Sequence, residues 1–213
     1  MAANYNNSAW FYDHLSRLIY GNAIIRSQIY LLSHISANRN ILIVGGGTGW
    51  ILEEITRTHP PGLNITYVEM SARMMALSHK RDIGGNSVIF INDAIENVKH
   101  QTVYDVVLTP FLFDNFTEQT LQKVFDHIHN YLKSGGIWLN TDFHLTGKWW
   151  QKLLLRSMFI FFRLICDIEA SKLPGIQQCF EHFGYISIDQ KSFFGDFIVS
   201  TAYSKTYEVL KTS

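Results

Sequence analysis

The stretch "ILIVGGGTGWILEEI", from Ile41 to Ile55, decides the fold. Four branched apolar residues predict a strand that is buried on both faces, as in a parallel sheet. Four glycines and a threonine follow at 45–49, and then a segment with helical character begins. A glycine-rich turn between a buried strand and a helix lets a ligand approach bare backbone, and the helix N-terminus offers unpaired N–H groups. The stretch therefore predicts a ligand-binding turn at the carboxyl end of an open α/β sheet.

The rest of the chain repeats this alternation of strand and helix. We predict strands at Asn40–Val44, Asn64–Val68, Ser87–Ile91, Tyr104–Leu108 and Gly136–Thr141, and helices at Trp50–Thr58, Ser71–Lys80 and Thr117–Lys133. Ser71 and Thr117 are suitable N-caps, and "SGG" after Lys133 is a stop signal. Such alternation is typical of a parallel sheet with right-handed crossovers.

The two ends of the chain depart from the alternation. Residues 8–35 have helical character without a strand, whereas "YISIDQ" and "FIVSTAY" (Tyr185–Gln190 and Phe197–Tyr203) are close enough for a hairpin. We therefore predict a Rossmann-like α/β fold with a seven-stranded, mostly parallel sheet, an antiparallel last strand and helices on both faces. A single domain is expected over 1–213, divided into an N-terminal helical cap (1–38), a core (39–142), a helical insertion (143–182) and a C-terminal hairpin (183–213).

The composition excludes several classes of protein. Lys and Arg together number 18, equal to Asp and Glu together, so the chain lacks the basic surplus of nucleic-acid-binding proteins. The two cysteines form no CxxC, and the nine histidines form no metal-ligand pattern, so no metal is expected. The N-terminus lacks the features of a secretory signal, which favours a cytoplasmic setting.

Glu69 follows the second predicted strand, 20 residues after Gly49. A carboxylate at this place can accept hydrogen bonds from the ribose of a bound nucleoside. The glycines do not match the dinucleotide fingerprint, because GxGxxG from Gly45 requires glycine at position 50 and Trp50 stands there. That third glycine allows close packing of helix on strand in dinucleotide folds. The pattern that remains is GxGxG.

Five motifs in order resemble those of the class I S-adenosylmethionine-dependent methyltransferases. They are "VGGGTG", "VEMS", "INDA", "YDVVL" and "LKSGGIWLNTDF". Within that class the chain is most similar to the small-molecule group that includes the ubiquinone and menaquinone methyltransferases, over about Tyr12 to Lys205. The resemblance implies S-adenosylmethionine as the cofactor, S-adenosylhomocysteine as its product and a small molecule as methyl acceptor.

The resemblance also implies a role for each matching residue. The backbone of the glycine turn (Gly45, Gly46, Gly47 and Gly49) would lie against the methionine part and ribose of the cofactor. Glu69 would hold the ribose hydroxyls and Met70 would lie against the adenine. Asp93 would bind the adenine amino group with the Ala94 backbone beside it, and Thr109 would lie where cofactor and acceptor meet. Family members usually carry an acidic residue two positions before the first glycine, where this chain has Ile43.

An acceptor that loses a proton would benefit from a general base. Candidates at strand ends or in the cap are His14, Asp114, Asp142 and His144, and we favour Asp142 and His144 because "TDFH" follows the fifth strand. The apolar segment Trp149–Ile168 is interrupted by charged residues that share one side of a helix. We predict that it packs as a helix, either as plain core or as a lid over an apolar or aromatic acceptor. A peripheral membrane contact is a further alternative, whereas a spanning segment is not expected.

Two other functions stay open. Ile43 and the lack of a convincing base allow a non-catalytic module that binds the cofactor without turnover. A nicotinamide-dependent oxidoreductase is the other enzyme class that such a glycine turn serves. The identity of the acceptor, its methylated atom and the oligomeric state do not follow from the residues.

Overall fold

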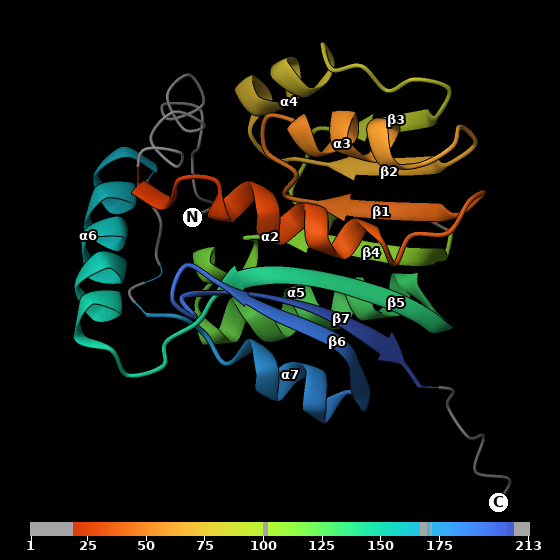
Figure 1. Ribbon diagram of the computed structural model, residues 1–213. Helices are drawn as coiled ribbons and strands as arrows, with labels where there is room; N and C mark the ends of the chain where they lie inside the picture. The colour runs from red at the N-terminus through yellow and green to blue at the C-terminus, as the bar shows by residue number, and fades with distance from the viewer. Residues whose placement is uncertain (1–18, 100–101, 167–169, 171, 207–213) are drawn as a thin grey trace, which may run out of the picture.

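The computed structural model describes residues 19–99, 102–166, 170 and 172–206. Within these ranges the chain forms one seven-stranded sheet of order β3-β2-β1-β4-β5-β7-β6 (Figure 1). The strands are β1 (Asn40–Val44), β2 (Asn64–Val68), β3 (Ser87–Ile91), β4 (Tyr104–Pro110), β5 (Leu132–Phe143), β6 (Tyr185–Phe193) and β7 (Ile198–Lys205). Pairs among β1 to β5 are parallel, whereas β7 runs antiparallel to both β5 and β6. The predicted mixed sheet is confirmed.

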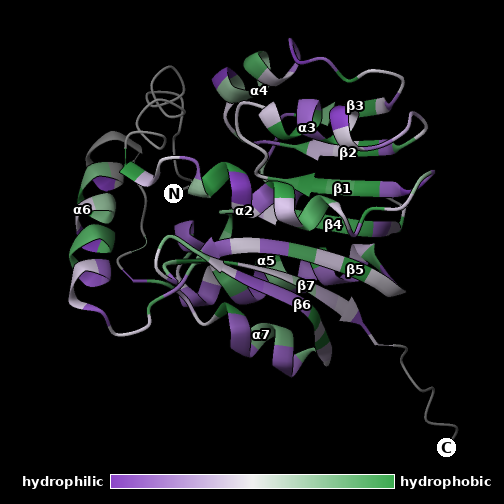
Figure 2. Ribbon diagram, viewed as in Figure 1, coloured by the Kyte–Doolittle hydropathy of each residue, from purple (hydrophilic) through white to green (hydrophobic). Residues whose placement is uncertain are grey.

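Helices cover both faces of this sheet because its central strands are apolar on both sides, as Figure 2 shows for β1. On one face α2 (Ala23–Leu32), α3 (Trp50–Thr58) and α4 (Ala72–Ser78) pack against residues such as Ile41 and Ile43. On the other face α5 (Glu118–Tyr131) and α7 (Ile176–His182) pack against residues such as Leu42 and Trp138. The two predicted N-caps are confirmed, because the Ser71 side chain accepts a hydrogen bond from the Met74 N–H and the Thr117 side chain accepts one from the Thr120 N–H.

The predicted boundary between the third helix and the fifth strand is wrong, and several other predicted ends differ by one to three residues. We expected a helix as far as Lys133 and a strand from Gly136, but α5 ends at Tyr131 and β5 begins at Leu132. Tyr104 pairs with Leu132 and Val106 pairs with Ile137, so "KSGG" forms a bulge in β5. Gly135 has φ +73°, and a Cβ on Gly136 would lie 2.6 Å from the Leu132 side chain. The glycines therefore allow the bulge instead of ending the helix.

The helix α6 (Trp149–Cys166) lies past the carboxyl ends of the strands (Figure 1). Its start is tied to the β6–β7 turn, because Gln151 Nε2 donates to the Gly195 carbonyl and Lys148 Nζ donates to Asp196 Oδ2. Its inner side packs Leu155 and Phe159 into a third apolar cluster with Phe197 of the turn. The predicted helical cap is thus present at the end of the sheet where the glycine turn lies.

Among the described residues, no helix combines the length and the apolar character that crossing a membrane requires.

Candidate functional site

A cavity of about 930 Å³ opens at the carboxyl ends of β1, β2 and β4. Its walls come from the glycine turn after β1, the residues that follow β2, β3 and β4, the last residue of β5, the start of α2 and the inner side of α6. Small-molecule sites usually have volumes of about 300–1,000 Å³. The cavity therefore has room for a nucleoside-sized cofactor together with a second small molecule.

The glycine turn forms the floor of this cavity, and Gly47 is fixed on both sides. Gly45, Gly46 and Gly47 line the cavity, and Gly45 and Gly47 have φ of +69° and +64°, which favour glycine. The Gly47 N–H donates to Glu69 Oε2 at 3.0 Å, and Tyr67 Oη donates to the Gly47 carbonyl at 2.9 Å. The turn is therefore shaped before a ligand arrives.

Glu69 connects the turn to the end of β2. Its side chain is buried, and its other oxygen, Oε1, accepts from the Ser71 N–H at 2.8 Å. Burial raises the pKa of Glu69, and the N–H groups of Ser71 and Gly47 partly oppose this shift by stabilising the carboxylate. A carboxylate has about four acceptor positions, so two hydrogen bonds leave capacity for the hydroxyls of a ligand.

Gly49 and Gly46 serve packing. A Cβ on Gly49 would lie 2.5 Å from Ser78 Cβ, so this glycine allows α3 and α4 to approach closely, and Gly49 does not line the cavity. A Cβ on Gly46 would lie 2.4 Å from the ring of Tyr67. In the dinucleotide fingerprint the third glycine, at position 50 here, allows close helix packing. In this chain Gly49 allows close packing instead, and Trp50 lines the cavity.

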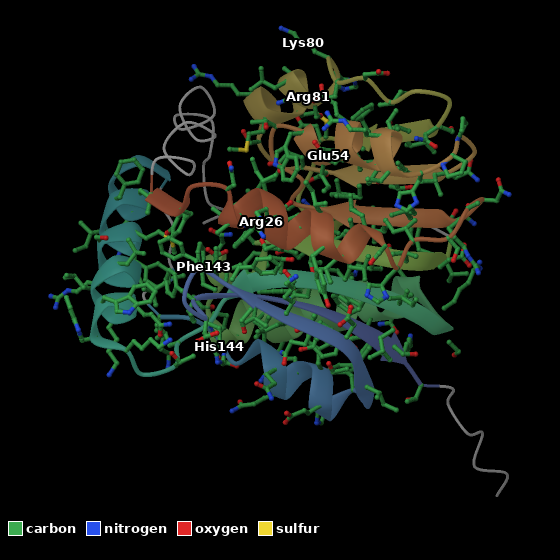
Figure 3. The ribbon with its side chains drawn as sticks, in the orientation of Figure 1. Arg26, Glu54, Lys80, Arg81, Phe143 and His144 are labelled. Carbon is green, nitrogen blue, oxygen red and sulfur yellow. The ribbon has the colours of Figure 1, made fainter. Side chains whose placement is uncertain are left out.

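Two further polar residues order the site and were missed from the sequence. Arg81 Nε donates to the Thr48 carbonyl at 2.9 Å, which holds the glycine turn from the side of α4 (Figure 3). Asn92 Nδ2 donates to the carbonyls of Glu69 and Met70 at 2.8 and 3.1 Å. No sequence motif indicated these two residues. An arginine or asparagine in a loop is common, and only the fold shows which backbone carbonyl its side chain binds.

Ile43 stands where an acid is usual, and it is fully buried in the core on the face covered by α2 and α3. It does not line the cavity. The turn is ordered by three hydrogen bonds that do not involve Ile43. Tyr67 and Arg81 donate to carbonyls of the turn, and the Gly47 N–H donates to Glu69.

The other predicted cofactor residues separate into two groups. Met70, Asp93 and Ala94 line the cavity, and Asp93 Oδ1 accepts from the Ala94 N–H at 2.7 Å. Thr109 does not line it, because its buried hydroxyl donates to Asn140 Oδ1 and accepts from Trp138 Nε1 inside the sheet. The structure therefore brings Glu69, Met70, Asp93 and Ala94 to one wall and leaves Thr109 beneath the surface.

The two favoured base candidates lie outside the cavity. Asp142 is buried below it, where Oδ1 accepts from the Phe143 N–H and Oδ2 from the Phe113 N–H. His144, labelled in Figure 3, is exposed. Its backbone N–H donates to the Phe197 carbonyl. Among the other two candidates, Asp114 lines the cavity, whereas His14 lies outside the described residues.

The fold and the glycine turn agree with the comparisons to known proteins. Residues 41–136 match the family model described as a methyltransferase domain. This match spans 96 of the 213 residues, from β1 into β5, so this part of the chain is similar to methyltransferase domains. The match does not single out the ubiquinone and menaquinone group.

Among curated proteins, the chain is similar to malonyl-[acyl-carrier protein] O-methyltransferase 2 of Ilyobacter polytropus. The two are 35% identical over 108 residues, which are 49% of this chain and 39% of that protein. This chain thus matches about two fifths of the length of that relative.

Solved structures share the fold at low identity. The 1,6-didemethyltoxoflavin-N1-methyltransferase of Burkholderia thailandensis, solved with bound 1,6-didemethyltoxoflavin and S-adenosylhomocysteine, has a TM-score of 0.66 at 13% identity, covering 94% of this chain and 85% of that one. The N-methyltransferase NodS of Bradyrhizobium japonicum, in complex with S-adenosylhomocysteine, has a TM-score of 0.62 at 12% identity, covering 86% and 84%.

The residues present fit S-adenosylmethionine. A Cβ on Gly47 would approach only Met74 Sδ, at 3.9 Å, so the backbone on the cavity side is bare. Glu69 retains acceptor capacity, and Asp93 and the Met70 side chain line the same cavity. These are groups that a ribose and an adenine require, beside backbone that a cofactor can approach closely.

Proposed function

We propose that this protein transfers a methyl group from S-adenosylmethionine to a small, apolar or aromatic molecule. The observation that supports the proposal most directly is the pre-shaped glycine turn with Glu69 bound to Gly47, beside a cavity larger than the cofactor needs. When bound, the cofactor supplies an electrophilic methyl group on a sulfonium. Methyl transfer then depends on aligning the acceptor with that methyl and excluding water.

In this proposal the chain's residues divide the task. The glycine turn and Glu69 bind the ribose and the methionine part, while Met70 and Asp93 bind the adenine. The wall formed by α2 and α6 holds the acceptor, and it is mostly apolar, with Ile24, Leu154 and Phe161 among its members. The motif resemblance favours a quinol-like acceptor, whereas the curated relative acts by name on malonyl-[acyl-carrier protein].

Calorimetry tests the binding part. We expect saturable binding of S-adenosylhomocysteine to the full chain, with weaker or no binding of NAD. A folded protein that binds neither S-adenosylmethionine nor S-adenosylhomocysteine would exclude the proposal, and preferential binding of NAD would favour an oxidoreductase. Formation of S-adenosylhomocysteine in the presence of candidate acceptors then separates an enzyme from a module that only binds.

We also propose a peripheral contact of α6 with an anionic membrane surface. Trp149, Leu153 and Ile160 form an exposed apolar row, with 76%, 62% and 52% of their surface accessible. Beside this row lie exposed basic residues (Lys152, Arg156 and Arg163), and α6 contains no acidic residue. Apolar side chains next to basic ones suit the interface of an anionic bilayer, where each basic residue contributes about 1 kcal/mol.

Vesicle sedimentation tests this contact. Wild type should sediment with vesicles that contain phosphatidylserine and much less with pure phosphatidylcholine, and the double variant Lys152→Glu, Arg156→Glu should lose the difference. A charge-matched double variant away from α6, Lys80→Glu with Lys123→Glu, both exposed, should keep it. Equal recovery of wild type with both vesicles, or a dimer that Leu153→Glu disrupts, would show that the row serves another purpose.

A further inference from the structure

The acceptor side of the cavity contains an aromatic wall formed by Phe111 after β4, Phe143 at the end of β5 and Tyr20 before α2. The Phe111 and Phe143 ring centroids are 5.0 Å apart, and Tyr20 lies 5.6 Å from Phe143. Phe111 has φ +50°, a conformation that costs a non-glycine residue of order 1–3 kcal/mol and is concentrated at functional sites. Its N–H donates to the Thr141 carbonyl at 2.7 Å, which helps to hold it there.

One charged side chain interrupts this wall. Among the described cavity-lining residues in 19–28 and 110–120, at Phe143 and on α6, Asp114 is the one with a charged side chain. It is only 8% exposed, and its Oδ1 accepts from Asn115 Nδ2 at 2.7 Å. The same short helix, η3 (Phe113–Asn115), follows Leu112, whose Cδ1 would lie 3.0 Å from a Cβ on Gly45. Asp114 is therefore close in sequence to a residue that packs on the glycine turn.

Asp114 faces two titratable groups. Asp142 on β5 raises the pKa of Asp114 by repulsion, in addition to the larger effect of burial. Tyr20, which precedes α2, also interacts with Asp114, and its pKa is raised by burial and then by that carboxylate. Burial raises the pKa of Asp142 to about 7, although backbone N–H groups of Phe143, Phe113 and Asp114 oppose the shift. Near neutral pH the two carboxyl groups together can thus hold a proton.

The two carboxyl groups have different surroundings. Asp142 accepts hydrogen bonds from the backbone and does not line the cavity, so it has a positioning role. Asp114 lines the cavity between aromatic residues. Two buried acidic groups that repel each other lower stability, and such an arrangement is typically retained for function.

We propose that Asp114 is the catalytic residue that receives the proton of the acceptor, and that the acceptor is an apolar molecule methylated on a hydroxyl group. This inference rests on the proposed function and adds the class of acceptor. The acceptor oxygen forms the new O–C bond, the C–S bond breaks with its electron pair left on sulfur, and the hydroxyl proton passes to the Asp114 carboxylate. The proton later leaves to solvent.

The charge of the site supports a hydroxyl over a carboxylate acceptor. A carboxylate would be repelled by Asp114 and Asp142, whereas a hydroxyl donates a hydrogen bond to Asp114. A general base works best when its pKa lies near the operating pH, and a phenol-like hydroxyl needs such a base to become a good nucleophile. The cluster of tilted rings formed by Phe111, Phe143 and Tyr20 suits an aromatic body on that hydroxyl.

The first test does not depend on turnover. S-adenosylmethionine differs from S-adenosylhomocysteine by a methyl group and a positive charge on sulfur, and a nearby positive charge lowers the pKa of a carboxyl group. Calorimetry in buffers of different ionisation enthalpy should therefore show that S-adenosylmethionine releases more protons than S-adenosylhomocysteine. Asp114→Asn should remove this difference, and the exposed α5 control Asp126→Asn should keep it. An unchanged difference in Asp114→Asn overturns the proposal.

The second test compares acceptors in the presence of the cofactor. We expect 2-methylhydroquinone and 4-methylphenol to be methylated, with octanoate and phenethylamine inactive. Asp114→Asn should lower kcat by about a hundredfold or more, as for loss of a general base, with little change in S-adenosylhomocysteine affinity. Methylation of octanoate or phenethylamine that is insensitive to Asp114→Asn overturns the proposal.

If no probe is turned over, binding to the S-adenosylhomocysteine complex decides. Tighter binding of the hydroxyl probes than of octanoate, lost in Asp114→Asn, supports the proposal, and any other order overturns it. Wild type that binds neither cofactor form would instead exclude the proposed function itself, so the two failures are distinguishable.

Discussion

Glu69 offers the sharpest perturbation of the cofactor site. Replacing it with alanine removes the acceptor of two backbone N–H groups, those of Gly47 at 3.0 Å and Ser71 at 2.8 Å. The Ser71 donor is buried, and a buried donor without a partner costs about 1–3 kcal/mol. The Gly47 donor faces the cavity, where water can replace the carboxylate, so its loss mainly loosens the turn.

The expected effect on binding follows from these contacts and from the ribose hydroxyls that Glu69 is proposed to hold. We expect Glu69→Ala to weaken S-adenosylhomocysteine by about 1–3 kcal/mol, or roughly 5- to 150-fold in Kd. Glu69→Gln should also weaken it, because an amide has one oxygen and would direct its NH₂ group at one of the two N–H donors. Glu181→Ala, an exposed change on α7, is the matched control.

The dependence on pH gives an independent signature. Ligand hydroxyls bind to the ionised carboxylate, and burial raises the pKa of Glu69 above its usual value. Wild-type affinity should therefore fall on acidification, starting at a higher pH than an ordinary glutamate would allow, while Glu69→Ala should be flat across that range. Isothermal titration calorimetry between pH 5 and 8, in the range where thermal melts show folded protein, measures both. Affinity of Glu69→Ala within about twofold of wild type would refute the reasoning.

Three further results are expected. Gly49→Ala should lower the free energy of unfolding by more than about 2 kcal/mol in a denaturant titration, because φ is +79° and the added Cβ would lie 2.5 Å from Ser78 Cβ. Gly147→Ala, where φ is +89° and the added Cβ would meet open space, should cost only about 1 kcal/mol in the same denaturant titration. Asp114→Asn should melt several degrees above wild type at pH 8 and at the same temperature as wild type at pH 4. The pKa of Asp114 is raised in the folded state, so ionisation of this acid lowers the stability of wild type as pH rises through that pKa. Phe161→Ala should raise KM for an apolar acceptor several-fold, with S-adenosylhomocysteine affinity unchanged, since Phe161 lines the cavity from α6. Three outcomes would contradict these expectations. They are an equal loss of unfolding free energy at both glycines, a melting temperature of Asp114→Asn below that of wild type at pH 8, and a changed S-adenosylhomocysteine affinity of Phe161→Ala.

The sequence by itself determined the central sheet and the place of the ligand turn. The bounds of β1, β2 and β3 are those predicted, because short apolar runs between turn residues indicate buried strands regardless of what packs on them. The antiparallel end of the sheet followed from two strands without a helix between them. The position of Glu69 beside the glycine turn was predicted from its spacing alone, because the end of the second strand lies next to the end of the first when the two strands pair in parallel.

Only the tertiary structure decided which side chains share the cavity. Asp142 lies near the end of β5 and Asp114 follows β4 at the same edge of the sheet, yet Asp142 accepts hydrogen bonds from backbone N–H groups while Asp114 lines the cavity. That choice depends on the local path of two loops, which no periodicity records. Tyr67 and Arg81 also depend on the tertiary structure, because each donates a hydrogen bond to a carbonyl of the glycine turn that is 20 or more residues away in the sequence. Contacts across such separations exist only once the sheet has brought the strand ends together.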